Sequence, residues 1–409
     1  FFFKQKTAYE IYQCDWSSDV CSSDFGFDAP NLWYLVRIDA PGLTLAGATV
    51  PGVPFLIIGH NGHVGWGFTT TGAETDRLFV ERTDSSDKNS IIKSDGSEPL
   101  ALHDEIIAVA GTEPEHIVVR ESHHGPVVSD VMTVPGLGTN EIATLASPSL
   151  RSDDRTAEAF YRVNRSATTA DVRIALRDFH APMQNVVFGD TDGNIGFVTA
   201  GLMPVTAPTD DPGLRHDAVD DGEVRYLPFE ELPQVFDPPK GRIVNANNKP
   251  IGGGYSHFLG SFWAGPERAM RIEQRLSDPQ PLDVTAFESI QTDDVSLGAQ
   301  TLLPRLLPFV AEAGLGQPAA TARERLAGWD GTMGRERPEP LIYHAWLDAL
   351  ARSLAAAHDL GDSGSLIATI PRPMTLMRIL ERFSAWPFVV YRGALGIFVL
   401  VASSNAWLQ

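Results

Sequence analysis

Residues 41–71 read PGLTLAGATVPGVPFLIIGHNGHVGWGFTTT, and this stretch decides the fold that the sequence predicts. Residues 55–58 (FLII) form a continuous apolar run, which is typical of a strand buried on both faces. Large side chains recur at alternate positions over 63–68, and the dipeptide Asn61-Gly62 between the two runs is a strong hairpin signal. The stretch therefore predicts a buried hairpin over 55–68 that ends in a polar strand terminus at 69–71.

The composition is that of a globular chain with a large core, since 43% of the 409 residues are hydrophobic. The formal net charge of −20 gives an acidic surface that repels phosphates, so we expect neither nucleic acid nor a membrane as a partner. Cys14 and Cys21 are the two cysteines, and both lie within residues 1–24. The remaining sequence therefore has no disulfide framework, no thiolate nucleophile and no thiolate zinc site.

Strand patterns dominate the first part of the chain and helical periodicity the second. Strands are predicted at 32–38, 78–81, 105–110, 116–120, 184–189, 195–198 and 241–246, the third and fourth as an antiparallel extension of the sheet. Helices that pack on the sheet are predicted at 156–163 and 169–179. Further helices are predicted at 268–276, 284–291, 299–313, 321–327, 342–357 and 374–383.

Two adjacent histidines, His123 and His124, precede Gly125-Pro126 in a predicted turn. Adjacent side chains on an extended chain point to opposite sides. We therefore expect both histidines to be structural and not a metal or catalytic pair.

Several stretches carry a family resemblance in the order in which they occur. After the opening stretch come His124-Gly125-Pro126, QNVVFGDTDGNIGF at 184–197, LPFEELPQVFDPPKGRIVNANNKP at 227–250, PERAMRI at 266–272 and GWDG at 328–331. Together they resemble the penicillin acylase family from about residue 25 to about residue 386. The resemblance implies an α+β fold, the αββα sandwich of N-terminal-nucleophile hydrolases, with largely antiparallel sheets in 25–265 and a helical region in 266–386.

The two ends of the chain depart from the family pattern. Residues 1–24, FFFKQKTAYEIYQCDWSSDVCSSD, resemble translated sequencing-adapter read-through, and we expect them to be foreign. In the family a serine opens the large chain slightly upstream of the position of Phe25, so we expect the nucleophile to be missing from this fragment. Residues 387–409 are interpreted either as a frame error or as a divergent helix.

The family pattern implies a set of catalytic residues. The nucleophile is an N-terminal serine whose own α-amine acts as the base. The side-chain amide of Asn247 and the backbone N–H of Thr70 form the oxyanion hole, and Arg268 orients the asparagine and the substrate. The alternatives are a turn asparagine at 247 and a solvent-exposed helix arginine at 268.

Four matched apolar positions imply a pocket for the acyl group: Phe25, Ile58, Phe68 and Ile195. Each could equally be core. Because apolar burial discriminates weakly between similar acyl groups, the sequence leaves aromatic and aliphatic substrates open.

The resemblance also implies a calcium site, which this sequence keeps only in part. Glu74 replaces one carboxylate ligand, and Asp76 stands where the family offers a backbone carbonyl. Arg77 and His257 occupy the positions of two further carboxylates, and an arginine opposes a cation. The alternative is an ion pair between Glu74 and Arg77. No organic cofactor is expected.

The resemblance implies a secreted or periplasmic amidohydrolase that cleaves itself into a small and a large chain. Its substrates would be N-acylated small molecules such as β-lactams or acyl-homoserine lactones, and its partner the small chain of the same precursor. One alternative is a catalytically inactive homologue that acts as a binding protein. A second, a peptidase with an internal serine, is disfavoured because the sequence has no G-x-S-x-G motif.

Overall fold

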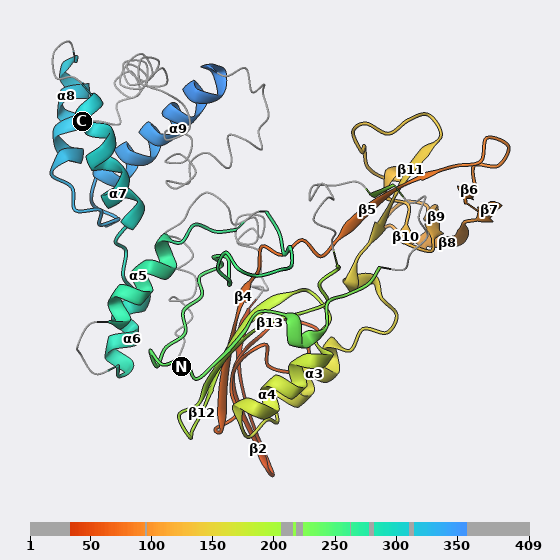
Figure 1. Cartoon of the computed structure of the whole chain (residues 1–409), viewed down its shortest axis with the longest axis horizontal. Coiled ribbons are helices and arrows are strands. Elements are labelled where there is room, and N and C mark those ends of the chain that lie inside the picture. Colours follow the sequence, from red (N-terminus) through yellow and green to blue (C-terminus); the bar gives the residue numbers. More distant parts are fainter. Residues whose placement is uncertain are drawn as a thin grey trace. The chain divides into compact units, whose positions relative to one another are not determined.

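The computed structural model describes residues 33–94, 96–205, 224–261, 263–277, 282–310 and 315–350 in full, and the backbone alone at 216–217 and 351–357. These residues form a sheet unit, Trp33–Ala264, and a helical unit that starts at Gly265, and each is described by itself (Figure 1). The predictions made for residues 1–24, Phe25, the helix at 374–383 and residues 387–409 lie outside the described residues. Within the described residues, no helix combines the length and the apolar character that a membrane span requires.

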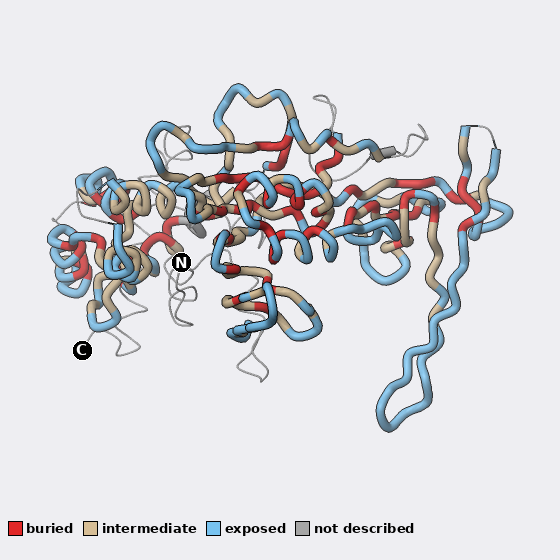
Figure 2. Tube along the Cα trace, turned by 90° about the horizontal axis from the view of Figure 1, so that it is seen from below, coloured by how far each residue is buried: buried red, intermediate tan, exposed pale blue. Residues whose placement is uncertain are grey.

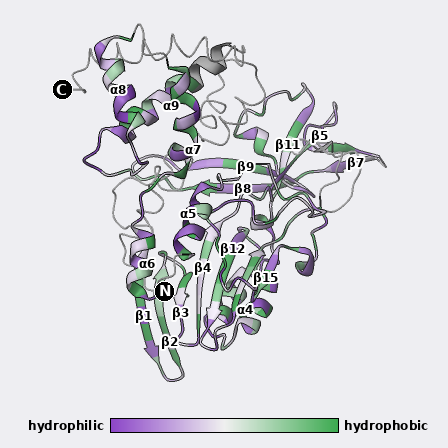
Figure 3. Ribbon diagram, turned by 60° about the vertical axis from the view of Figure 1, so that its left-hand side comes forward, coloured by the Kyte–Doolittle hydropathy of each residue, from purple (hydrophilic) through white to green (hydrophobic). Residues whose placement is uncertain are grey.

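A seven-stranded sheet forms the centre of the sheet unit, and all its neighbouring strands are antiparallel. Three of its strands, β1, β2 and β12, are hydrophobic over much of their length (Figure 3). In spatial order they are β1 (Tyr34–Ala40), β2 (Leu43–Thr49), β3 (Ile58–His60), β4 (Val64–Thr70), β12 (Gln184–Asp190), β13 (Ile195–Ala200) and β15 (Gln234–Phe236).

The hairpin predicted from Asn61-Gly62 is confirmed, because β3 and β4 pair with Gly59 opposite Trp66. The strand predicted at 55–58 is wrong in extent, since β3 begins only at Ile58. The buried side chain of Asn164 explains this difference: its Oδ1 accepts the N–H of Leu56 at 2.8 Å and its Nδ2 donates to the Leu56 carbonyl at 2.9 Å. The backbone polar groups of Leu56 are thus satisfied by a side chain and not by a strand partner.

Two helices, α3 (Thr156–Val163) and α4 (Thr169–Ala175), cover one face of this sheet, as predicted (Figure 1). The short helix η3 (Leu176–Asp178) continues α4. Their apolar faces form one core with the sheet; it includes Leu45, Val64, Trp66, Ala159, Val163, Val172, Leu176, Phe179, Val186 and Val198. The described residues thus supply one sheet and one helical layer of a sandwich.

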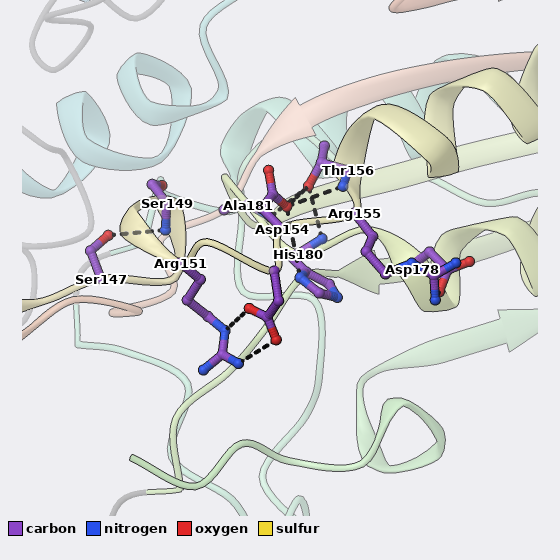
Figure 4. Close-up of polar contacts among 10 residues, drawn as sticks. Ser147, Ser149, Arg151, Asp154, Arg155, Thr156, Asp178, His180 and Ala181 are labelled. Carbon is purple, nitrogen blue, oxygen red and sulfur yellow. Dashed lines mark hydrogen bonds and ion pairs between the residues drawn. The ribbon is translucent and has the colours of Figure 1, made fainter. Parts of the chain in front are cut away.

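The start of α3 is tied to the segment that leads into β12 (Figure 4). Thr156 Oγ1 accepts the backbone N–H groups of His180 at 3.0 Å and Ala181 at 3.1 Å. Asp154 Oδ1 accepts the N–H of Thr156 at 3.1 Å and its hydroxyl at 2.7 Å. The bond to Asp154 satisfies one N–H donor of the first helical turn, and the bonds from His180 and Ala181 join the start of α3 to the segment before β12.

Three smaller sheets complete the strand inventory of the sheet unit. They are β11 (Glu141–Ala146) with β5 (Arg77–Arg82) and β14 (His216–Asp217), β10 (Gly125–Pro126) with β9 (Glu115–Ser122) and β8 (Ala101–Ile107), and β6 (Ser90–Lys93) with β7 (Gly96–Pro99). The expectation that 105–110 and 116–120 extend the main sheet is wrong, because β8 and β9 pair with each other in a separate sheet. Every residue of β8 is exposed, and Figure 2 shows this pair as a largely exposed ribbon.

The described part of the helical unit has five α-helices: α5 (Glu267–Leu276), α6 (Val284–Gln291), α7 (Leu297–Leu306), α8 (Gln317–Ala327) and α9 (Glu339–Ala357). The helix predicted at 299–313 is wrong in extent, because α7 ends at Leu306 and the 3-10 helix η5 (Leu307–Phe309) follows, where Pro308 lacks the N–H that an α-helix needs. The other four lie close to the predicted positions. Asp283 and Ser296 cap α6 and α7, each accepting a backbone N–H of the first turn. The core of this unit includes Leu302, Leu306, Leu326, Trp329, Tyr343, Trp346 and Leu350. Further short 3-10 helices of the sheet unit are η1 (Val128–Asp130), η2 (Pro148–Leu150) and η4 (Phe229–Glu231).

Candidate active site

The segment that carries Asn247 is curled by its own asparagine side chains. Asn247 has φ +61°, in the left-handed region that asparagine tolerates better than most residues. Its N–H donates to Asn245 Oδ1 at 3.1 Å, and Asn248 Oδ1 accepts the N–H of Ala246 at 3.0 Å. The strand predicted at 241–246 is therefore wrong, because these local side-chain bonds replace a strand ladder.

Asn245 ties this segment to the central sheet. Its Oδ1 accepts the hydroxyl of Thr69 on β4 at 2.6 Å and the Nδ2 of Asn185 on β12 at 3.2 Å. Asn185 is fully buried, and its own Oδ1 accepts the hydroxyl of Thr199 on β13 at 3.0 Å. A chain of hydrogen bonds across three strands therefore fixes the position of the Asn245 side chain.

The two predicted oxyanion-hole residues lie together. The Nδ2 of Asn247 donates to the backbone carbonyl of Thr70, the last residue of β4, at 2.9 Å. Asn247 is half-buried and Thr70 is exposed, so this place is open to a reactant. The arrangement holds a neutral side-chain amide beside the exposed end of a central strand, which is the kind of donor that stabilises a developing oxyanion.

Four residues at this place were not predicted as site residues. The sequence reasoning interpreted Gln184 and Asn185 as hairpin structure, Thr69 as part of a polar strand end whose N–H groups could face a ligand, and Asn245 as part of a strand. Gln184 pairs with Thr70 in the register of β12 and β4. One sequence signal that could have found Asn185 is a polar amide at the start of an otherwise apolar strand, QNVVF, since a strand buried in a core requires a partner for such a group.

Arg268, the third predicted catalytic residue, lies on α5 in the helical unit and is half-buried. The alternative reading of Arg268 as a solvent-exposed helix arginine therefore does not describe this side chain. Its action on Asn247 stays a prediction.

The structure does not gather the predicted acyl-pocket residues at the Asn247 end of β4. Phe68 packs in the core, with its ring centroid 5.5 Å from that of Phe160 and 5.9 Å from that of Phe179. Ile195 is level with Gly65, five residues from Thr70 in the sheet register, which is about 17 Å along the strands. Ile58 is half-buried on β3. Their contact with substrate stays a prediction.

An arginine holds the loop in which calcium was expected. Arg77 is buried, and its Nη1 donates to the backbone carbonyls of Glu74 at 2.7 Å and Asp76 at 3.0 Å. The carboxylate of Glu74 accepts the N–H of Ser261 at 2.7 Å, and Asp76 is exposed. His257, at another matched position, is paired with Glu231 at 2.8 Å. This arrangement does not fit a cage of six to eight oxygens, and calcium at Glu74 and Asp76 stays a prediction.

One carboxylate of the sheet has a strongly shifted pKa. Burial raises the pKa of Asp190, but hydrogen bonds from Asn194 and Thr169 outweigh it and lower the pKa to about 2. Asp190 Oδ2 accepts the N–H of Thr169, at the start of α4, at 3.1 Å. Asp190 therefore joins the β12–β13 turn to α4. It lies level with Val64, at the other end of β4 from Thr70.

Comparison with solved structures defines the class of the fold. A thermostable penicillin G acylase from Alcaligenes faecalis superposes with a TM-score of 0.76 at 16% sequence identity, covering 94% of this chain and 75% of that chain. The antiparallel sheets and the helices of this chain thus have the α+β fold of that penicillin G acylase, which confirms the predicted fold class.

Sequence comparison then gives the family. Residues 23–392 match the penicillin amidase family, and the chain belongs to it. An acyl-homoserine lactone acylase QuiP of Pseudomonas fluorescens is 28% identical over 341 residues, covering 79% of this chain and 41% of that protein. A penicillin acylase 2 proenzyme of Pseudomonas sp. is 28% identical (82% and 42% covered), and a penicillin G acylase of Escherichia coli 27% identical (81% and 40%). The chain therefore spans about two fifths of the length of these curated relatives.

Proposed function

We propose that the full-length protein hydrolyses the amide bond of N-acylated small molecules, with Asn247 and Thr70 forming the oxyanion hole. One observation carries this proposal: the Asn247 amide is held 2.9 Å from the end of β4, on a backbone in the left-handed conformation. An asparagine whose only role is to form a turn does not require a side-chain hydrogen bond to a strand that is distant in sequence. The side chain of Asn248, by contrast, bonds only within its own segment in the contacts described, at Ala246 and Lys249.

The proposed chemistry uses a nucleophile and a donor pair. The nucleophile is the N-terminal serine that the family pattern places upstream of Phe25. Its α-amine, with an ordinary pKa of roughly 7.7–8.0, accepts the hydroxyl proton near neutral pH. As the serine oxygen attacks the amide carbon, negative charge forms on the carbonyl oxygen, and each neutral donor lowers the barrier by on the order of 3 kcal/mol.

The relatives narrow the substrate class. Both penicillin acylases and acyl-homoserine lactone acylases are amidases of N-acyl compounds by name, so we propose a β-lactam or an acyl-homoserine lactone as substrate. We further propose that the protein is made as a precursor that cleaves itself, that the small chain of that precursor is its partner, and that it acts outside the cytoplasm.

Expression of the full-length gene tests the proposal. The protein should release amine from penicillin G or from N-acyl-homoserine lactones, and replacing the first residue of the large chain with alanine should abolish release. If wild-type protein releases no amine from either class, or if the large chain starts with a residue that has no hydroxyl or thiol, the protein is a binding homologue and the proposal is wrong.

A further inference from the structure

A cluster of one carboxylate and two imidazoles lies outside the proposed active site. Glu81 is on β5, and His123 and His124 form the two-residue turn between β9 and β10, where Ser122 pairs with Gly125. One ligand atom from each of the three residues lies within 4.8 Å of the other two. The expectation that the histidines point to opposite sides is wrong, because a tight turn brings their ring centroids to 3.9 Å.

Glu81 and His124 are buried, and only one of the two polar side-chain atoms of each residue is hydrogen-bonded. Glu81 is 3% exposed and His124 is 9% exposed. His124 Nδ1 lies 2.7 Å from Glu81 Oε1, which also accepts the Ser122 hydroxyl at 2.9 Å. The other polar atoms of the pair, Glu81 Oε2 and His124 Nε2, are buried and have no hydrogen-bond partner among the described residues. Unsatisfied buried polar atoms are costly, and a bound ion would satisfy them.

The surrounding structure holds the cluster in place. The ring of Phe79 stacks on that of His124, with centroids 3.8 Å apart and planes at 7°. The N–H of His124 donates to Ser122 Oγ at 3.1 Å. Gly125 has φ +140°, and a Cβ there would lie 2.1 Å from the carbonyl oxygen of Leu145. The turn therefore presses against β11, which leaves the histidines little freedom to move away from Glu81.

We propose that Glu81, His123 and His124 bind a divalent transition-metal ion of the zinc class. Two imidazoles and a carboxylate are donors that suit zinc, whereas calcium prefers an all-oxygen set. Ligand atoms about 2.0–2.1 Å from a tetrahedral zinc ion are about 3.4 Å apart. The ligand atoms of the cluster lie within 4.8 Å of one another, so small side-chain movements are enough to accommodate the ion. His123 is the exposed member, which gives the ion a path from solvent.

The ion would link β5 to the β9–β10 turn, and thus two of the small sheets to each other. Two charged neighbours border the cluster. Glu98 Oε1 lies 3.7 Å from His123 Nδ1, and Glu98 Oε2 is 2.8 Å from the ammonium group of Lys93. The Glu98 carboxylate thus contacts both the Lys93 ammonium group and the His123 ring.

Zinc and cobalt titrations of metal-free full-length protein test this site. Isothermal titration with ZnCl₂ should show one equivalent bound per chain, and CoCl₂ should give visible ligand-field absorption that zinc abolishes and calcium does not. His123→Ala should weaken zinc binding at least tenfold. Because His123 is exposed, this variant keeps the fold, which its thermal unfolding without metal should verify.

The matched control is His103→Ala. His103 on β8 forms an exposed pair with Glu121 on β9, with His103 Nε2 2.8 Å from Glu121 Oε2. Among the described residues, this pair is not joined by a third histidine or carboxylate that could complete a metal site. This variant should bind zinc as the wild type does. The proposal is overturned if wild-type protein binds no zinc at 100-fold molar excess, or if His123→Ala binds zinc as tightly as wild type. It is equally overturned if His103→Ala and His123→Ala lose the same affinity, which would indicate nonspecific surface binding.

Discussion

Replacing Asn245 with alanine should damage catalysis although this residue need not touch the substrate. The change removes one oxygen that accepts three donors: the Thr69 hydroxyl, the Asn185 amide and the N–H of Asn247. Each bond contributes about 1 kcal/mol, so the segment should lose roughly 3 kcal/mol of its preference for the observed position. Because water can enter this half-buried place, we expect about 2 kcal/mol after partial compensation.

A loss of that size corresponds to a fall of about tenfold to a hundredfold in kcat, since each 1.4 kcal/mol is a factor of ten. The assay is steady-state amine release by correctly processed full-length protein, with urea unfolding measured in parallel. Thr69→Val removes one of the three bonds and should cost roughly a third as much, whereas Thr69→Ser keeps the hydroxyl and should be mild. The reasoning is refuted if Asn245→Ala keeps kcat within twofold of wild type, or if Thr69→Ser is as damaging as Thr69→Val.

Three stability predictions accompany this one, each measured as the free energy of unfolding in denaturant. Asn164→Ala leaves the buried N–H and carbonyl of Leu56 unpaired and should cost about 2–4 kcal/mol; a loss below 1 kcal/mol would mean that water replaces the side chain. Asp190→Ala should cost about 1 kcal/mol at pH 7. Because the folded-state pKa of Asp190 is lowered to about 2, its contribution is present above the ordinary carboxyl pKa, so the deficit should shrink as pH falls from 4 to 2; a constant deficit would contradict this. Gly125→Ala should cost more than about 1 kcal/mol, because its Cβ would meet the Leu145 carbonyl; an unchanged stability would show that β11 moves aside.

Local periodicity was sufficient to predict some of the regular elements, but not strands such as β6, β7 and β11. The spacing of apolar residues in 156–163 and 284–291 predicts α3 and α6 at the bounds observed. The Asn61-Gly62 signal predicts the β3–β4 hairpin. In each case the residues that determine the structure are close in sequence, so a short window contains the information.

Asparagine side chains explain two failures, one through a residue distant in sequence and one through local bonds. Residues 55–58 and 241–246 have strand composition, but asparagine side chains satisfy their backbone groups or curl the chain. The same physics limits the prediction of the site. Family pattern alone predicted Asn247 and Thr70, whereas the role of Asn245 depends on a bond to Thr69 across 176 residues, which no local pattern contains.

The histidine pair shows a related limit. The extended-chain argument assigns His123 and His124 to opposite faces, but the turn between β9 and β10 places their rings side by side and next to Glu81. A sequence window indicates that a turn is present, but it does not indicate which distant strand receives the turn's side chains.

The kcat of Asn247→Ala in correctly processed full-length protein tests the central claim most directly, with Asn248→Ala as the matched control. Asn247 donates to the end of β4, whereas Asn248 bonds within its own segment at Ala246 and Lys249. Loss of a neutral oxyanion donor should lower kcat by about 10²–10³ and change KM little, because the donor acts on charge present in the transition state. Asn248→Ala should be mild. A near-normal kcat for Asn247→Ala, or a larger loss for Asn248→Ala, would contradict the assignment of Asn247 to the oxyanion hole.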